Sequence, residues 1–339
     1  MRSIKEAGLG RNLRGGLAGA CLFAMTATTA VAAGSPHFRG DLQAQLDALA
    51  HKAEPGKFGI SVLDLESGKR WGVDAGSAYP MMSVFKAPLG ATVLAQADAG
   101  KISLSQHVTI RRADLRTGAS RIAEEFRGEQ MTFTVQELLV DAVSYSDNTA
   151  ADALVRLIGG PQVITSFLEG HGIRGLHVDI DEGGVSHVFS GLGVAAQPPE
   201  GETKAEREHR LERGYDAYLS DPRNRSTPDA AVAFLQTLWN GRLLPTKSTK
   251  HLLDLLYGQT KPSRLRAGIP AGVRLADKCG TSESLHGRTA AFNDIGIMTW
   301  PDGRTVIVAA FLTGSKASQA ERNQLFADLA HDVGVTLHP

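Results

Sequence analysis

The apolar positions change their spacing along the chain. Near both ends they form short runs that are typical of strands, and in the middle they recur every three or four residues, as in amphipathic helices. Turn signals at Glu66-Ser67-Gly68 and Pro301-Asp302-Gly303 predict hairpins between neighbouring runs. The predicted strands are 58–65, 69–73, 273–278, 289–299 and 305–313; the predicted helices are 37–53, 84–97, 135–143, 149–158, 228–238 and 317–333.

This order of elements predicts a fold class. Strands at opposite ends of a chain must pair to bury their apolar faces, so the two ends are expected to form one sheet. We predict a two-lobed α/β (α+β) fold: an antiparallel sheet built from both chain ends with flanking helices, and an inserted all-helical lobe. The first lobe would hold about 36–82 and 262–339, and the helical lobe about 83–261. We expect a small-molecule site in the crevice between them.

One segment of the helical lobe, about 183–225, has no clear period, and we predict a long loop insertion there. Opposite charges four residues apart, as in Glu206 and Arg210, are typical of a solvated helix within it. The run 191–196 formally matches a dinucleotide-binding fingerprint. Because no strand leads into it and two prolines follow, we interpret it as loop.

The N-terminus resembles a secretory signal. Four basic residues precede an apolar run over about 17–33, and Ala30-Val31-Ala32 supplies the small residues that a signal peptidase needs. A membrane anchor is the alternative; lipidation at Cys21 is disfavoured because the apolar run continues past it. We predict removal of residues 1–32 near Ala32, leaving one catalytic domain, 33–339, that is periplasmic or secreted.

Charge and cysteine content bear on the protein's partners and on the source of its stability. The full chain of 339 residues has 36 basic and 36 acidic residues, and loss of 1–32 leaves 32 and 35, a net charge of −3. Nothing here favours nucleic acid as a partner. Cys279 is the one cysteine after residue 32, so stability must come from the core, which 42% hydrophobic residues can supply. We expect a monomer without stable membrane insertion.

Three short motifs carry candidate chemistry. Ser83 and Lys86 stand three apart where a helix begins, so a desolvated lysine amine can take the serine proton. Ser146-Asp147-Asn148 precedes a helix and is also an ordinary capping sequence. Lys278-Cys279-Gly280-Thr281 lies on or just past a strand, where Gly280 would let a ligand approach the backbone. Each motif alone has an ordinary structural explanation.

In this order the three motifs resemble those of serine β-lactamases and penicillin-binding proteins. The 63 residues from Ser83 to Ser146, the flank Tyr79-Pro80-Met81-Met82 and the run 290–296 also resemble class A β-lactamases, and the likeness extends from about residue 40 to 335. We therefore identify the chain as similar to that family.

The resemblance implies an acyl-enzyme on Ser83, with the backbone amides of Ser83 and Thr281 as oxyanion hole. Lys86, or Glu182 through a water, would take the serine proton. Glu182, 36 residues after Ser146, would activate the deacylating water, with Asp181 and Asp179 as fallback candidates. Ser146 would protonate the leaving nitrogen, and the substrate-binding residues would be Asn148, Lys278, Cys279, Gly280, Thr281 and Arg264. No metal or cofactor is implied.

Several positions depart from the family pattern. Cys279 replaces a hydroxyl residue, and a thiol is a weak donor as well as an oxidisable group. Arg264, or else Arg288, would replace the arginine that binds the substrate carboxylate. Ile180 stands where the family has a loop-closing arginine, and no aspartate partner is evident. The segment after Glu182 is about thirty residues longer than the usual loop.

These features predict an exported enzyme that hydrolyses β-lactam antibiotics and confers resistance to them. A peptidoglycan D,D-peptidase and a non-hydrolysing penicillin-binding sensor are the alternatives. The eleven histidines include no His-x-His or His-Glu-x-x-His spacing, which disfavours metal-dependent hydrolysis.

Overall fold

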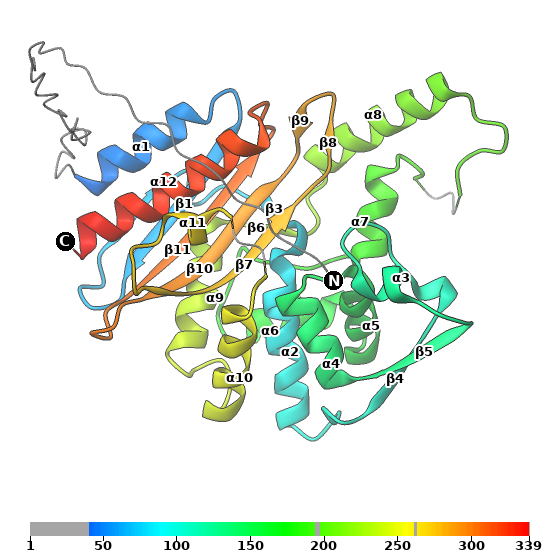
Figure 1. Cartoon of the computed structure of the whole chain (residues 1–339), viewed down its shortest axis with the longest axis horizontal. Coiled ribbons are helices and arrows are strands. Elements are labelled where there is room, and N and C mark those ends of the chain that lie inside the picture. The colour runs from blue at the N-terminus through cyan, green and yellow to red at the C-terminus, as the bar shows by residue number, and fades with distance from the viewer. Residues whose placement is uncertain (1–40, 194–196, 261–262, 339) are drawn as a thin grey trace, which may run out of the picture. The chain divides into compact units, whose positions relative to one another are not determined.

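The computed structural model describes residues 41–193, 197–260 and 263–338. The predicted signal sequence and its cleavage site lie outside the described residues. An antiparallel five-stranded sheet runs in the order β2-β1-β11-β10-β7, so the N-terminal β1 pairs along its length with the C-terminal β11 (Figure 1). This pairing confirms the predicted sheet from both chain ends. Its strands are β1 (Lys57–Asp64), β2 (Arg70–Val73), β7 (Arg274–Thr281), β10 (Phe292–Thr299) and β11 (Thr305–Thr313).

Terminal helices cover one face of this sheet. α1 (Leu42–Lys52) and α12 (Gln319–Leu337) pack on each other, and the short α11 (Leu265–Gly268) packs on α12. Phe326 of α12 lies between Phe58 and Phe292, with ring centroids 5.1 and 5.5 Å away. Burial of these large apolar surfaces stabilises the pairing of the two chain ends.

The other face carries the helical lobe. Its central helix α2 (Lys86–Asp98) is buried on every side from Lys86 to Leu94, as expected for a helix that is apolar all round. α9 (Pro228–Trp239) packs on β11 and β1, and α10 (Thr246–Tyr257) packs on β7 and α2. Before residue 182 the other helices of this lobe are α3 (Arg121–Glu125), α4 (Val135–Leu139), α5 (Asn148–Ile158) and α6 (Pro161–Gly170). Two short pairs of strands accompany them: β3 (Tyr79–Pro80) with β6 (Arg225–Ser226), and β4 (His107–Arg111) with β5 (Gln130–Thr134).

Two predicted elements differ in detail from those observed, and α3, α6, α10, β4 and β5 were not predicted. The predicted helix 135–143 is α4 followed by a π-helical turn, Val140–Ser144. The predicted strand 289–299 is divided between two strands. Thr289 ends β9 (Arg288–Thr289), which pairs with β8 (Ser284–Leu285), and β10 begins at Phe292. Among the residues described, no helix is long and apolar enough to cross a membrane.

The prediction of a loop over 183–225 was wrong for most of its length. α7 (Glu182–Phe189) opens the segment, and α8 (Lys204–Ser220) begins at a capping box formed by Thr203 and Glu206. The buried residues of α8 are few and fall mostly in its C-terminal half, so its sequence shows no continuous apolar stripe. The spacing of opposite charges indicated this helix, and the Thr203–Glu206 capping box is a second signal in the sequence that the prediction did not use.

The close contact of α11 with α12 predicts a strong effect of one added methyl group. A Cβ on Gly268 would overlap the backbone carbonyl of Ala327. We expect Gly268→Ala to lower the free energy of unfolding by about 2 kcal/mol or more, because backbone must shift to accept it. Gly76→Ala is the matched control, since a Cβ there meets nothing within 4 Å. Equal stability of the two variants in urea unfolding would contradict this packing.

Candidate active site

The candidate nucleophile Ser83 lies in a strained turn. Met82, just before it, has a φ of 47°, which is uncommon for a residue with a side chain. The side-chain Nδ2 of Asn293 donates to the Met81 carbonyl at 3.0 Å and holds this turn against the sheet. A Cβ on Gly280 would overlap the same carbonyl, so the close approach that Gly280 permits is first of all to the nucleophile turn.

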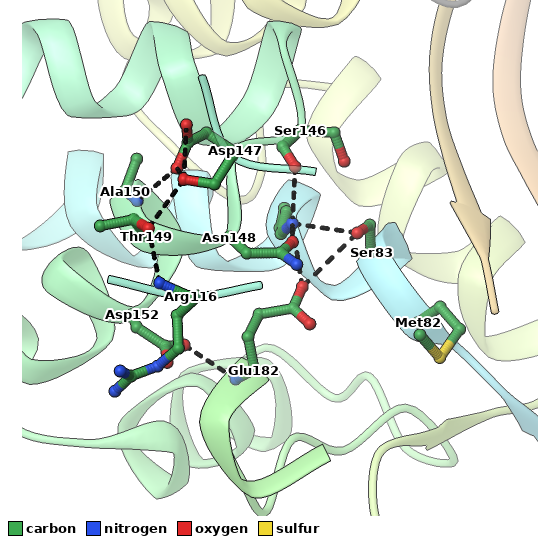
Figure 2. A network of polar contacts seen from close by, with 12 residues as sticks. Met82, Ser83, Arg116, Ser146, Asp147, Asn148, Thr149, Ala150, Asp152 and Glu182 are labelled. Atoms are coloured by element: carbon green, nitrogen blue, oxygen red, sulfur yellow. Dashed lines mark hydrogen bonds and ion pairs between the residues drawn. The ribbon is translucent and has the colours of Figure 1, made fainter. Parts of the chain in front are cut away.

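Lys86 is the centre of the polar contacts around Ser83. Its Nζ is fully buried and lies 3.0 Å from Ser83 Oγ, 2.6 Å from Asn148 Oδ1, 2.9 Å from the Ser146 carbonyl and 2.9 Å from Glu182 Oε1. Figure 2 shows the Glu182 carboxylate pointing toward Ser83. The amine therefore contacts both the nucleophile and the carboxylate that sequence analysis selected.

The three side chains of segment 146–148 have different roles. Asp147 caps α5 by accepting from the Ala150 amide at 2.8 Å, which is the ordinary role of such a sequence. Ser146 has a φ of 63°, and its Oγ accepts from Lys278 Nζ at 3.0 Å. The cap thus orients a turn whose other two side chains face the lysines.

Lys278 brings a second buried amine to the site. Burial lowers the pKa of Lys278 to about 8, and the positive charge of Lys86 adds to the lowering. Side chains alternate along a strand, so Cys279 and Thr281 project from the face of β7 opposite to Lys278. The buried Cys279 thiol is therefore on the same side as Thr281.

Glu182 is held through its own backbone. It is the first residue of α7, and its amide donates to Asp152 Oδ1 at 2.8 Å, while the Gly183 amide donates to Asp152 Oδ2 at 3.1 Å. Arg116 forms an ion pair with the same carboxylate. Burial, followed by the charge of Asp181, raises the pKa of Asp152 to about 6. Sequence analysis missed Asp152, although a carboxylate within an otherwise buried apolar helix was a usable signal.

The fallback carboxylates have other partners. Asp181 caps α7 by accepting from the Gly184 amide at 2.8 Å. Asp179 accepts from His177 Nδ1 at 2.6 Å and from the Asn224 amide at 3.0 Å. Of the three candidates, Glu182 is the one whose carboxylate contacts Ser83 and Lys86.

Asn224 closes the base of the segment that carries Glu182. Its Oδ1 accepts from the amides of Asp179 and Ile180 at 2.7 and 3.1 Å, and its Nδ2 donates to the Ile180 carbonyl at 2.8 Å. The neutral side-chain amide of Asn224 thus closes the segment with hydrogen bonds, where the family pattern would use a salt bridge between an arginine and an aspartate. The signal was weak, because an asparagine at 224 is also typical of a turn.

The two candidate arginines lie in different places. Arg264 is buried, donates to the Gly280 carbonyl at 3.1 Å and also donates to Thr281 Oγ1. Arg288 pairs with Asp216 of α8. Arg264 is therefore the arginine that the fold brings to the end of β7 that carries Thr281.

Comparisons with known proteins agree with this arrangement. Residues 41–337 match the model of the beta-lactamase enzyme family. A solved class A beta-lactamase described as the last common ancestor of Gram-negative bacteria is 33% identical, with a TM-score of 0.71 over 88% of this chain and 100% of that one. The chain belongs to the class A beta-lactamase family.

Curated relatives in this β-lactamase family are similar over most of their length. The chain is 32% identical to beta-lactamase L2 of Stenotrophomonas maltophilia, covering 83% of this chain and 82% of the relative. It is also 32% identical to the extended-spectrum beta-lactamase PER-1 of Pseudomonas aeruginosa, covering 74% and 73%. A beta-lactamase structure from Chitinophaga pinensis, 28% identical, has a TM-score of 0.74 over 88% of this chain and 100% of that one.

The role of Asp152 in holding α7 can be tested by its removal. Asp152→Ala leaves two backbone amides and Arg116 without their acceptor, so we expect a loss of about 3 kcal/mol in unfolding free energy. Amides over 182–189 should also exchange faster with deuterium. Asp254→Ala removes an exposed ion pair and should cost less than about 0.5 kcal/mol. Unchanged exchange in α7 would show that Asp152 does not hold it.

Proposed function

We propose that this protein hydrolyses the amide bond of penicillin- and cephalosporin-type β-lactams through an acyl-enzyme on Ser83, with Glu182 activating the deacylating water. The observation that carries the proposal is the position of Glu182 Oε1, 2.9 Å from Lys86 Nζ and 3.5 Å from Ser83 Oγ. A carboxylate beside an acylated serine can act as a general base toward water, and turnover depends on that step.

In acylation, Ser83 Oγ attacks the lactam carbonyl carbon and loses its proton. Either Glu182 takes that proton through a water, or Lys86 takes it directly after passing its own proton to Glu182, since both side chains contact the hydroxyl and each other. The amides of Ser83 and Thr281 would bind the oxyanion. When the carbon–nitrogen bond breaks, Ser146 Oγ protonates the nitrogen and is reprotonated from the lysines beside it.

In deacylation, Glu182 takes a proton from a water as the water attacks the ester carbon. The bond to Ser83 Oγ then breaks, the serine regains a proton, and the opened antibiotic leaves as a carboxylic acid. The contact of Glu182 Oε1 with Lys86 Nζ at 2.9 Å would hold the carboxylate beside the ester that the water attacks.

The substrate carboxylate would bind along the edge of β7, the last strand of the sheet, where side chains from both faces can reach it. Lys278 would supply charge from one face, and Thr281 and Arg264 would supply hydrogen-bond donors from the other, while Asn148 would orient the substrate's side-chain amide. Cys279 lies on the same face of β7 as Thr281, and its thiol is a weaker hydrogen-bond donor than a hydroxyl would be.

We also propose that residues 1–32 direct export and are removed near Ala32. The remaining catalytic domain, 33–339, would act as a monomer in the periplasm or outside the cell and protect the host from β-lactams. N-terminal sequencing of the exported protein, followed by size-exclusion chromatography with light scattering, tests both statements. An intact N-terminus in membranes, or a stable dimer, would contradict them.

The central test follows the hydrolysis of a chromogenic cephalosporin and of benzylpenicillin together with the intact mass of the protein. Rapid turnover with little adduct supports hydrolysis. A stoichiometric, persistent adduct would instead support a D,D-peptidase or a sensor. Ser83→Ala should abolish both adduct and turnover; ring opening at the wild-type rate would overturn the nucleophile.

Glu182→Gln should separate the two chemical steps. The amide has nearly the same shape but cannot accept the water's proton, so we expect the penicilloyl adduct to form and then persist, with deacylation at least about 100-fold slower. Asp181→Asn keeps a capping oxygen and should turn over normally. If Asp181→Asn accumulates the adduct and Glu182→Gln does not, the assignment of the base is wrong.

The lowered pKa of Lys278 predicts an alkaline limit. Because Lys278 loses its charge as the pH rises through about 8, kcat/KM for benzylpenicillin should fall about tenfold between pH 7 and 9, mainly through KM. The methyl ester of benzylpenicillin lacks the carboxylate and should not show this rise in KM. Lys278→Arg should move the limit upward, since a guanidinium stays charged. Identical profiles for acid and ester would contradict this role.

A further inference from the structure

Helix α8 belongs to the long segment after Glu182 and has no role in the mechanism above. Its buried residues form a small apolar cluster that is separate from the two main cores. We refer to it as the α8 cluster; its members are Val185, Tyr215, Tyr218 and Ala290, with Met82, Ile180, Val188, Phe189, Leu219 and Leu285 packed against them. These residues come from α7 and the segment before it, from α8, from the β8–β9 hairpin and the link to β10, and from the position before Ser83.

The contact between α8 and α7 is close enough to involve backbone. A Cβ on Gly214 would overlap the Phe189 carbonyl and the Gly191 amide, so this glycine lets the end of α7 lie directly on α8. The Phe189 ring stacks on Tyr218 with centroids 4.0 Å apart. Gly191, with a φ of 63°, then turns the chain away. The C-terminal end of α7 therefore rests on α8.

On its other side α8 is attached to the β8–β9 hairpin, which follows Thr281 (Figure 1). Tyr215 donates its hydroxyl to the Arg288 carbonyl at 2.7 Å, and Asp216 pairs with the Arg288 guanidinium. Glu212 lies 3.0 Å from His286 Nε2 at the hairpin turn. Residues of two adjacent turns of α8, Glu212 and then Tyr215 and Asp216, thus connect the helix to the hairpin.

A third contact reaches the nucleophile turn. The Tyr218 hydroxyl donates to Met82 Sδ at 2.8 Å, and Met82 immediately precedes Ser83. Arg225 donates to the Tyr218 carbonyl and holds the C-terminal end of α8 against β6. One turn of α8 therefore touches the end of α7 and the residue beside Ser83.

We propose that α8 is a strut that sets the position of Glu182 relative to Ser83, and that Gly214 and Tyr218 are positioning residues for deacylation. Asp152 holds the N-terminal end of α7 from the helical lobe, and α8 holds its C-terminal end from the sheet. A carboxylate that must hold a water against an ester tolerates little displacement, since an error of about 1 Å can cost about 100-fold in rate.

The strut should act selectively on deacylation. Acylation depends on Ser83, Lys86, Ser146 and Lys278, whose polar contacts described above are with one another and with residues outside α8. This inference rests on the proposed function, because Glu182 must be the base of deacylation for the selectivity to appear.

Gly214→Ala is the first test, with Arg213→Gln as control on the exposed side of the same turn. Mass spectrometry after rapid mixing with benzylpenicillin measures formation and decay of the adduct separately. For Gly214→Ala we expect deacylation to slow at least tenfold and acylation to change less than threefold; the control should match wild type. Equal slowing of both steps, or of neither in a folded variant, would overturn the proposal.

A second pair at Tyr218 avoids reliance on one variant. Tyr218→Leu removes the ring that stacks on Phe189, and Tyr218→Phe keeps it, so the adduct should accumulate with Leu and decay at nearly the wild-type rate with Phe. Loss of deacylation in both variants would assign the effect to the hydrogen bond from the Tyr218 hydroxyl to Met82 Sδ and would overturn the packing role.

Deuterium exchange separates this inference from the proposed function. If α8 is a strut, amides over 182–189 and 284–289 exchange faster in Gly214→Ala than in Arg213→Gln, without any substrate. Wild-type protein that forms no adduct would overturn the proposed function alone, whereas unchanged exchange with normal wild-type turnover would overturn the strut.

Discussion

The buried ammonium of Lys86 is the constraint on which the site depends. An unpaired charge in such a place would be strongly unfavourable, so oxygens must surround it. Ser83, Ser146, Asn148 and Glu182 supply them from separate parts of the chain. Satisfying one charge therefore brings together the nucleophile, the turn before α5 and the start of α7, and any element that moves one oxygen also disturbs the others.

The backbone around this charge is correspondingly strained. Met82 and Ser146 have positive φ angles without being glycine; Met82 precedes Ser83, which contacts Lys86, and Ser146 contacts Lys86 through its own carbonyl. Such conformations persist only where surrounding contacts over-determine them. Asn293 and Gly280 do so for the nucleophile turn, and Asp147 with its cap does so for the other. Strain and restraint occur together where geometry matters for chemistry.

Glu182 shows how a segment can be held without the expected salt bridge. Asn224 closes its base with hydrogen bonds to backbone, Asp152 fixes the first turn of α7, and α8 supports the far end. The first two restraints are hydrogen bonds to backbone groups, and these do not depend on which side chain stands at position 180. The role of one charged pair is thereby divided among several contacts.

Periodicity and motif order in the sequence alone determined the sheet from both ends, the helical lobe and the three motifs, because local patterns reflect which face of an element is buried. The sequence identified Gly280 and Ser146 as candidate site residues, but it did not predict the contact of Gly280 with Met81 or that of Ser146 with Lys278. Asp152, Asn224 and α8 depended on tertiary structure. A carboxylate in a buried helix, an asparagine in a turn and a mostly polar helix acquire partners only when distant segments meet, and no local spacing encodes that meeting.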